Sequence, residues 1–354
     1  MTLSDIAHLR LHNQHLTRPV FNKPGEVVRS LGAVQAQDYL ASLWAVGLRL
    51  PNATEADVEQ AIANREMVRT WPMRGTIHYV APEAARWMLG LLTPRVIARS
   101  AGRYRALELD DSVFSHSRRV LEKALQDGKL LTRGAICKLL EAEGIVTAES
   151  RGLHILGHWA QKGLICFGPR AAKQPTFVLL DRWIPRSKTL ERDEALAQLA
   201  RRYFKSHGPA TLQDFAWWSG LTVADAKVGL EPVKPEFTHA DVNDVTYWFI
   251  DNVGSGEIAP QLLPFFDEFL VAYKDRGAAL EPSHTPKVNA GGGLLNPTVV
   301  LNGRVVGTWK RTFKKDTVFI SLNLFMPLSK VQTQAVHAAA ERYGRFVKMM
   351  AMVN

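Results

Sequence analysis

Apolar and polar positions along the chain follow patterns of short helices that lead into pairs of strands. The clearest copy has helices at 115–127, 131–144 and 149–163 and strands at 164–168 and 176–183. Thr132 suits the N-cap of its second helix, and Gly128 and Gly144 follow two of the helical patterns as stops. Three helices followed by a β-hairpin are the winged-helix arrangement, a helix-turn-helix variant.

The same order of elements recurs on both sides of this copy. The later copy has helices at 191–207, 211–220 and 222–230 and a strand, turn and strand over 237–250. The earlier copy has helices at 3–16, 24–32 and 55–67 and a β segment at 70–80. We therefore expect three tandem winged-helix units.

Beyond about residue 262 the pattern becomes mainly β. Residues 297–311 and 316–325 alternate like strands, and Asn302-Gly303 predicts a type I′ turn. A final helix is expected at 329–350, and 277–297 reads as a long mobile loop. The predicted fold class is mainly α with β (α+β), with three winged-helix units followed by a β-rich C-terminal region. The predicted domains are 1–108, 109–187 and 188–255 as winged-helix units and 256–354 as the β-rich region.

Composition adds a strong positive charge to this picture. Lys and Arg number 44 against 34 Asp and Glu, which gives a formal net charge of +10. A basic protein of this length suits nucleic acid or another polyanion, although a basic enzyme of another class has the same balance. No apolar run long enough for a membrane span and no leader-like block occur, so we expect a cytoplasmic protein. The positive charge favours association with the nucleoid, and we expect a monomer. Two cysteines without a CxxC fit a reducing compartment.

Common catalytic motifs are missing from the sequence. There is no GxSxG, P-loop, HExxH or GxGxxG pattern. His154 and His158 have metal-like spacing on one predicted helix, but no third ligand is near, so we expect neither a metal nor a cofactor.

Cations lie among Trp309 and Phe313 in 309–315, and the segments 73–78 and 274–276 add further basic residues. Cations with aromatic residues suit a surface that neutralises phosphates and stacks on bases. The alternative for each residue is an ordinary solvated strand face. The candidate DNA contacts are Arg74, His78, Arg276, Trp309, Lys310, Arg311, Lys314 and Lys315.

Two glutamines flank a small residue in Gln35-Ala36-Gln37, directly after a helix that carries Val27 and Val28 inward. In a continuous helix the two side chains would diverge by about 200°. In an extended chain they point the same way and Ala36 faces the protein body. A joint role for the pair therefore requires a non-helical backbone.

Four blocks of this sequence resemble the winged-helix DNA glycosylases, whose AlkZ-like and YcaQ-like members unhook interstrand crosslinks. The blocks are "LGAVQAQDYLASLWAVGLRLP", "MVRTWPMRGTIHYVAPE", "LLPFFDEFLVAYKDR" and "VVLNGRVVGTWKR". They cover nearly the whole chain in family order. The resemblance implies three winged helices around a basic channel, a lesion-probing hairpin and a catalytic motif that matches here as Gln35-Ala36-Gln37, the Gln-x-Gln branch.

Two amides fit one kind of glycosylase chemistry. A carboxamide is no general base, but an N7-alkylated purine is already cationic and leaves without protonation. Gln35 and Gln37 would then orient water and solvate the developing sugar cation. We expect a monofunctional DNA glycosylase for alkylated purines in double-stranded DNA, including crosslinked ones. The rival hypotheses are a non-enzymatic winged-helix regulator and an inactive family member.

Overall fold

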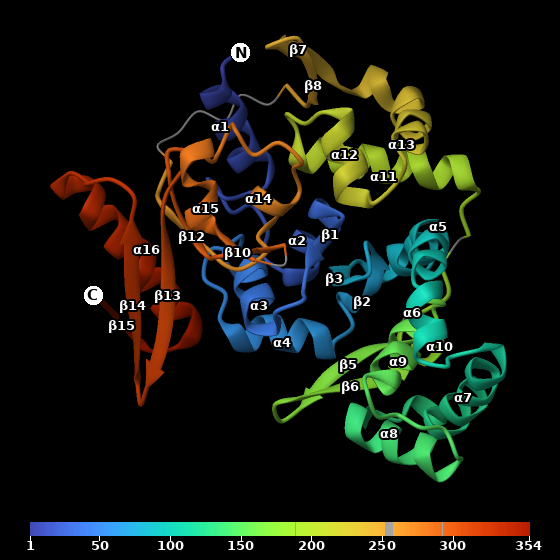
Figure 1. The fold of residues 1–354 in the computed structure, drawn as a ribbon. Helices are drawn as coiled ribbons and strands as arrows, with labels where there is room; N and C mark the ends of the chain where they lie inside the picture. Colours follow the sequence, from blue (N-terminus) through green and yellow to red (C-terminus); the bar gives the residue numbers. More distant parts are fainter. Residues whose placement is uncertain (188, 252–257, 292) are drawn as a thin grey trace. The chain divides into compact units, whose positions relative to one another are not determined.

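The chain is an α+β protein, as expected, and its computed structural model describes residues 1–187, 189–251, 258–291 and 293–354 (Figure 1). It divides into two compact units, one of Glu59–Ala195 and one of Met1–Val58 with Leu196–Asn354. The second of these units is therefore assembled from both ends of the chain. Within the described ranges, no helix is long and apolar enough to cross a membrane.

The unit Glu59–Ala195 begins inside a helix and contains a sheet flanked by helices. Its elements are α4 (Glu55–Ala63), β2 (Val68–Met73), β3 (Thr76–Val80), α5 (Pro82–Arg99), α6 (Ala101–Ala106), α7 (Asp111–Ala124), η1 (Gln126–Gly128), β4 (Leu131–Thr132), α8 (Arg133–Ala142), α9 (Arg151–Gln161), β5 (Ile165–Ala171), β6 (Gln174–Leu179) and α10 (Leu180–Trp183). Its strands lie in the order β3-β2-β5-β6-β4, and all neighbours are antiparallel. Trp71 stacks on Phe167 at 4.6 Å between ring centroids, so aromatic rings hold β2 on β5.

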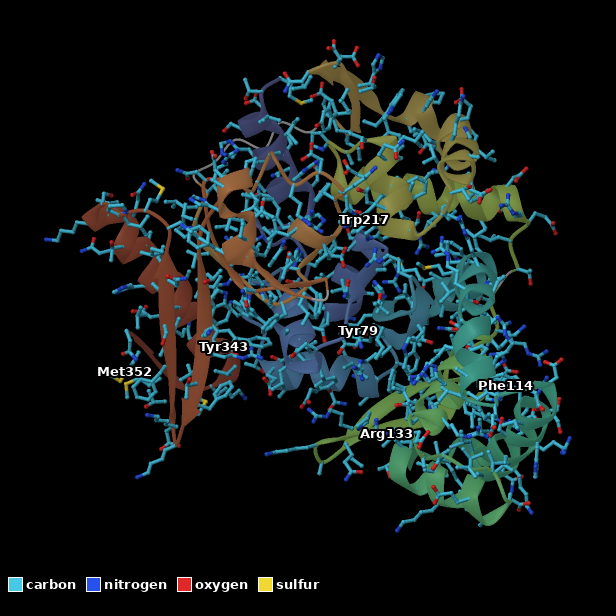
Figure 2. The ribbon with its side chains drawn as sticks, viewed as in Figure 1. Tyr79, Phe114, Arg133, Trp217, Tyr343 and Met352 are labelled. Atoms are coloured by element: carbon cyan, nitrogen blue, oxygen red, sulfur yellow. The ribbon has the colours of Figure 1, made fainter. Side chains whose placement is uncertain are left out.

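The predicted helix–helix–helix–hairpin order is confirmed for α7 to β6 in this unit. Thr132 is the N-cap of α8, and its hydroxyl accepts the Ala135 N–H at 3.3 Å. Phe114 of α7, labelled in Figure 2, is buried and stacks on His158 of α9 at 3.8 Å. The local elements thus form where side-chain periodicity and caps place them.

The unit built from both chain ends contains the remaining elements. They are α1 (Leu3–Asn13), α2 (Pro24–Leu31), β1 (Ala33–Gln35), α3 (Tyr39–Gly47), α11 (Arg192–His207), α12 (Leu212–Ser219), α13 (Val223–Leu230), η2 (Glu231–Glu236), β7 (Thr238–Val242), β8 (Val245–Phe249), β9 (Gln261–Leu263), α14 (Glu268–Val271), η3 (Pro282–His284), α15 (Thr285–Val288), β10 (Asn289–Gly291), β11 (Leu294–Leu295), β12 (Thr298–Leu301), β13 (Arg304–Lys314), β14 (Thr317–Leu324), α16 (Lys330–Val347) and β15 (Met350–Val353). The order α11, α12, α13, β7, β8 again matches the predicted elements.

A five-stranded sheet ends this unit, in the order β15-β14-β13-β12-β9, with β14 and β15 parallel. The predicted Asn302-Gly303 turn is confirmed, because Leu301 pairs with Arg304 and both turn residues have positive φ. Helix α16 packs on the sheet through Tyr343, labelled in Figure 2, whose ring lies 5.2 Å from that of Trp309. The sheet therefore has one face that the final helix covers.

Helices α3 and α5 are among those that the apolar pattern did not predict. Every residue of α3 from Ala41 to Gly47 is buried, so the helix has no polar face and no amphipathic period. Helix α5 carries Pro94 in its interior, which disrupts the usual helical signal. Helices without a solvated side are hard to recognise from periodicity alone.

The expectation of one long loop over 277–297 is wrong for the described residues of that segment. They include η3, α15 and the β10–β11 pair, and Ala279, Val288 and Leu295 are buried. Small apolar residues anchor this segment although its Gly, Pro and Ser content suggests a loop. The predicted domain boundaries and the basic channel stay predictions, and the boundary at 255/256 lies outside the described residues.

Candidate functional site

The Gln-Ala-Gln segment lies between two helices in a non-helical stretch of backbone. Helix α2 ends at Gly32, whose φ of +78° favours glycine, and β1 then runs to Gln35. Helix α3 begins at Tyr39, with the Asp38 carboxylate accepting the Ala41 N–H. The backbone condition for a joint role of the two glutamines is therefore met.

Burial differs between the three residues of this segment. Gln35 is 7% exposed and Ala36 is fully buried, whereas Gln37 is exposed. Ala36 thus faces the protein body, as expected for an extended chain. Gln37 is the member of the pair that solvent reaches most readily.

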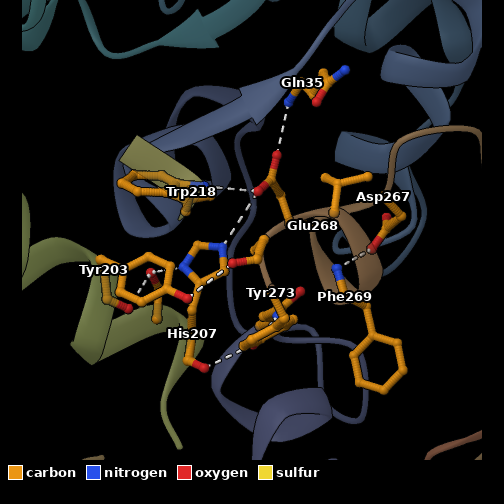
Figure 3. A network of polar contacts seen from close by, with 12 residues as sticks. Gln35, Tyr203, His207, Trp218, Asp267, Glu268, Phe269 and Tyr273 are labelled. Carbon is orange, nitrogen blue, oxygen red and sulfur yellow. Dashed lines mark hydrogen bonds and ion pairs between the residues drawn. The ribbon is translucent and has the colours of Figure 1, made fainter. Parts of the chain in front are cut away.

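A buried carboxylate holds the main chain of Gln35. Its backbone N–H donates to Glu268 Oε1 at 2.9 Å, and Glu268, the first residue of α14, is fully buried. In Figure 3 the Gln35 side chain extends away from Glu268, on the other side of its own backbone. Glu268 therefore fixes the strand that carries Gln35 and leaves the amide to point elsewhere.

Trp218 fixes the other oxygen of the same carboxylate. Its indole N–H donates to Glu268 Oε2 at 3.0 Å (Figure 3). A methyl group added at Gly32 would come within 3.6 Å of the Trp218 ring, so the indole also packs against the turn before β1. The segment and α14 are thus held together through one aromatic side chain.

His207 lies on the far side of Glu268 and is fully buried. Its Nε2 is 3.5 Å from Glu268 Oε2, and its Nδ1 donates to Ser206 Oγ at 2.8 Å. The direction of the second bond follows because the Ser206 hydroxyl donates its own hydrogen to the Arg202 carbonyl. Burial lowers the pKa of His207 although Glu268 raises it, which favours the neutral imidazole.

A buried ion pair anchors the loop before α14. The Arg49 guanidinium makes two 2.9 Å hydrogen bonds to the Asp267 carboxylate, and both side chains are buried. Arg49 also donates to the Ala45 and Gln14 carbonyl oxygens. Asp267 in turn accepts the Phe269 N–H as the N-cap of α14. The pair therefore ties α3 and α1 to the residue directly before Glu268.

Three of the predicted DNA contacts are exposed lysines on one hairpin. Lys310 and Lys314 lie on β13, and Lys315 lies in the turn before β14. Arg311 is half-buried, with its guanidinium donating to the Tyr343 hydroxyl. The predicted hairpin with its cations is therefore present.

Trp309 lacks the exposed ring that stacking on a DNA base would need. It is 2% exposed, and its indole N–H donates to the Leu263 carbonyl at 2.8 Å. Strand alternation predicts that Trp309 and Arg311 share a face, but it cannot show that α16 covers this face. Phe313, two positions further on, is 44% exposed and is the accessible aromatic residue of the strand.

His78 is also buried and so lacks the exposed ring that a DNA contact would need, and the guanidinium of Arg74 already hydrogen-bonds to it. His78 is fully buried, its Nδ1 donates to the Thr76 carbonyl, and its Nε2 accepts from Arg74 at 3.3 Å. Arg276 is half-buried and donates to the Leu270 carbonyl at 2.8 Å, and burial lowers its pKa. These side chains hold their own loops in addition to any contact they make with DNA.

A cavity of about 290 Å³ opens near the start of α3. Its lining consists of Ala41, Pro264, Phe265, Asn296, Pro297, Trp309, Lys310 and Arg311. Ala41 is four residues after Gln37, so their Cα atoms are at most about 14 Å apart. The apolar wall with a cationic rim thus lies close to the candidate catalytic segment.

No metal centre accompanies this site in the part of the chain that the structure describes. There, no three His, Cys, Asp or Glu side chains gather as metal ligands do. Independence from a cofactor stays a prediction.

Comparison with solved structures shows which fold the chain shares with a known protein. The chain is similar in structure to a Streptomyces sahachiroi DNA glycosylase, AlkZ, with a TM-score of 0.82, 23% identity and full coverage of both chains. It is 28% identical over 365 positions to an interstrand DNA cross-link repair glycosylase of Streptomyces sahachiroi, covering 93% of this chain and 94% of the relative. A family model described as DNA glycosylase AlkZ-like matches residues 28–346. The chain belongs to the AlkZ-like DNA glycosylase family.

Sequence reasoning missed the residues behind Gln35. Glu268 and Asp267 lie in the block "LLPFFDEFLVAYKDR", which contributed to the resemblance, but neither residue was among the candidate site residues. Their one local signal is a pair of carboxylates inside an otherwise apolar run, because a buried charge requires partners. Trp218 and His207 carry no comparable mark in the sequence.

Proposed function

We propose that this protein hydrolyses the N-glycosidic bond of N7-alkylated purines in double-stranded DNA, with Gln35 and Gln37 as its catalytic residues. The main support is that the Gln35-Ala36-Gln37 segment is non-helical in a chain of the AlkZ-like family. Glu268 accepts the Gln35 backbone N–H and is itself held by the Trp218 indole. The Gln-x-Gln pattern of this segment is the form that the resemblance assigns to the AlkZ-like branch.

The amides suit a substrate that already carries its positive charge. The C1′–N9 bond breaks, its electron pair goes to the alkylated purine, and the base leaves neutral. Water then adds to C1′ of the oxocarbenium ion and loses a proton to solvent. Neither step requires a general base, so hydrogen bonds from the glutamine side chains suffice to place the water and solvate the cation. Unmodified purines are poor leaving groups and stay intact.

Crosslinked purines belong to the proposed substrates. The curated relative is named as an interstrand cross-link repair glycosylase, and the fold is shared over the full length of both chains. A crosslinked base cannot leave the duplex completely before cleavage, so it needs an accessible site. The exposure of Gln37 agrees with such a site. We further propose a monofunctional enzyme that acts as a monomer at the nucleoid.

The exposed lysines of the β13–β14 hairpin are the proposed phosphate contacts. Changing Lys310 and Lys314 to Ala should flatten the salt dependence of DNA affinity by about one unit per lost contact. Lys330→Ala, an exposed lysine outside the predicted set, is the matched control and should leave the slope unchanged. Salt-independent binding by the wild type would contradict the proposed interface.

Base release tests the activity. The wild type should release the base from an oligonucleotide duplex carrying one N7-methylguanine and should unhook a duplex crosslinked through N7. Gln35→Ala and Gln37→Ala should lose most of this rate, whereas Gln60→Ala, at an exposed glutamine, should retain it. Borohydride should trap no covalent complex if the enzyme is monofunctional.

Two outcomes would change the proposal. DNA binding without base release from either duplex would favour a non-enzymatic DNA-binding protein. Full activity in both glutamine variants would keep the reaction but move the site.

A further inference from the structure

A carboxylate lies directly behind the candidate catalytic segment, although the segment itself contains only amides. Glu268 is fully buried, and its Oε1 is 2.9 Å from the backbone nitrogen of Gln35. The Gln35 side chain extends from the opposite side of the strand (Figure 3). A negative group therefore stands on the far side of Gln35 from the end of its side chain.

We propose that Glu268 stabilises the positive charge that develops on the deoxyribose, acting through the protein from behind Gln35. The inference rests on the proposed function, since it concerns the same cationic transition state. Glu268 does not touch the substrate, so it is a positioning residue whose charge also acts at a distance. No bond forms to Glu268, and no proton leaves it during the reaction.

Two hydrogen-bond donors meet the side chain of Glu268. One oxygen accepts the Gln35 N–H and the other accepts the Trp218 indole N–H, so both oxygens act as hydrogen-bond acceptors, as those of a carboxylate do.

This arrangement explains how a site with two amides can favour a cation. A carbonyl dipole stabilises positive charge only at close range, whereas a full charge acts over several ångströms in a medium of low dielectric. At an effective dielectric constant near 20, two opposite unit charges about 8–10 Å apart attract each other by an amount that corresponds to a roughly 15- to 35-fold change in rate. Glu268 thus adds to the work of the glutamines without a proton transfer.

The first experiment separates charge from hydrogen bonding. Glu268→Gln keeps an oxygen for the Gln35 N–H but brings an NH2 group toward the Trp218 N–H. Trp218→Phe removes that N–H. When Glu268→Gln is made in a Trp218→Phe background, the new NH2 group therefore no longer faces a second hydrogen-bond donor. In single turnovers on N7-methylguanine DNA, the loss of charge should slow base release by roughly 15- to 35-fold in both backgrounds. Recovery of the rate in the double variant would overturn the inference.

The second experiment uses binding alone. An abasic-site analogue with a pyrrolidine ring mimics the sugar cation, and a tetrahydrofuran site is its neutral counterpart. The wild type should bind the pyrrolidine duplex at least about tenfold more tightly, and Glu268→Gln should reduce this preference while affinity for the tetrahydrofuran duplex stays within about twofold. A residue with a merely structural role would weaken both affinities together.

The outcomes keep the two proposals distinct. A wild type that releases no alkylated base contradicts the proposed function, whatever Glu268 does. A wild type that releases base but shows no preference for the cationic analogue contradicts the role of Glu268 alone, and this measurement requires no variant to fold. Equal loss of affinity for both analogues in Glu268→Gln overturns the inference as well.

Discussion

Breaking the Arg49–Asp267 pair should strongly destabilise the unit that carries Gln35. Arg49→Met removes two 2.9 Å hydrogen bonds to the Asp267 carboxyl group, which is 2% exposed and would stay buried without this partner. Loss of one member of a buried ion pair typically costs about 3–5 kcal/mol. That is a large part of a typical unfolding free energy of about 5–15 kcal/mol.

A double-mutant cycle tests the physical cause. Asp267→Asn keeps an oxygen that can cap α14 at Phe269 and removes the charge. Combined with Arg49→Met, it should restore at least about 2 kcal/mol relative to the sum of the single changes. Urea unfolding of the four proteins, followed by circular dichroism, gives the free energies.

The result that would refute this reasoning is additivity. If the two single changes sum to the double change within about 0.5 kcal/mol, the charges are not coupled. A cost below about 1 kcal/mol for Arg49→Met would likewise show that water reaches Asp267 and solvates it.

Three further changes have expected outcomes. Burial lowers the pKa of His158 to about 4, below its ordinary 6.5, so the unfolded chain takes up this proton at a higher pH than the folded protein does. The free energy of unfolding should therefore fall as the pH drops from about 6.5 to 4, and His158→Phe should flatten this part of the stability–pH profile. Burial raises the pKa of the Cys166 thiol, so a disulfide reagent should modify only the half-buried Cys137 in the native protein and both thiols in guanidinium. Rapid labelling of Cys166 in the native protein would contradict its burial. Gly303→Ala should lower the unfolding free energy by about 1–2 kcal/mol, since φ is +77° and the new methyl would come within 2.9 Å of Ala7; an unchanged urea midpoint would show that the turn adapts.

The parts of the fold that sequence predicts well are those with local causes. The Asn302-Gly303 turn and the Thr132 cap depend on residues within four positions of one another. The helix end at Gly32 also has a local cause, but the non-helical backbone at Gln35 and Gln37 was only a condition, because the helix that Asp38 caps was not predicted. Backbone geometry near the site follows from nearby side chains.

The parts that sequence did not predict depend on contacts across long separations. Glu268 reaches Gln35 over 233 positions, and nothing near either residue specifies the other. Trp309 was predicted to be an exposed aromatic residue, because the sequence around it does not show that α16, later in the chain, covers its face of the strand. Which face of a strand is covered, and which carboxylate lies behind a motif, are decided by tertiary packing.

The origin of one unit from both ends of the chain has a consequence for how the protein is made. Gln35 leaves the ribosome 233 residues before Glu268, which is roughly 10–50 s at ordinary rates of synthesis. During that interval the glutamine segment exists without the carboxylate, the indole of Trp218 and the Arg49–Asp267 clamp complete. A chain released early therefore carries the motif but not the assembled site, and only nearly full-length molecules should act on DNA.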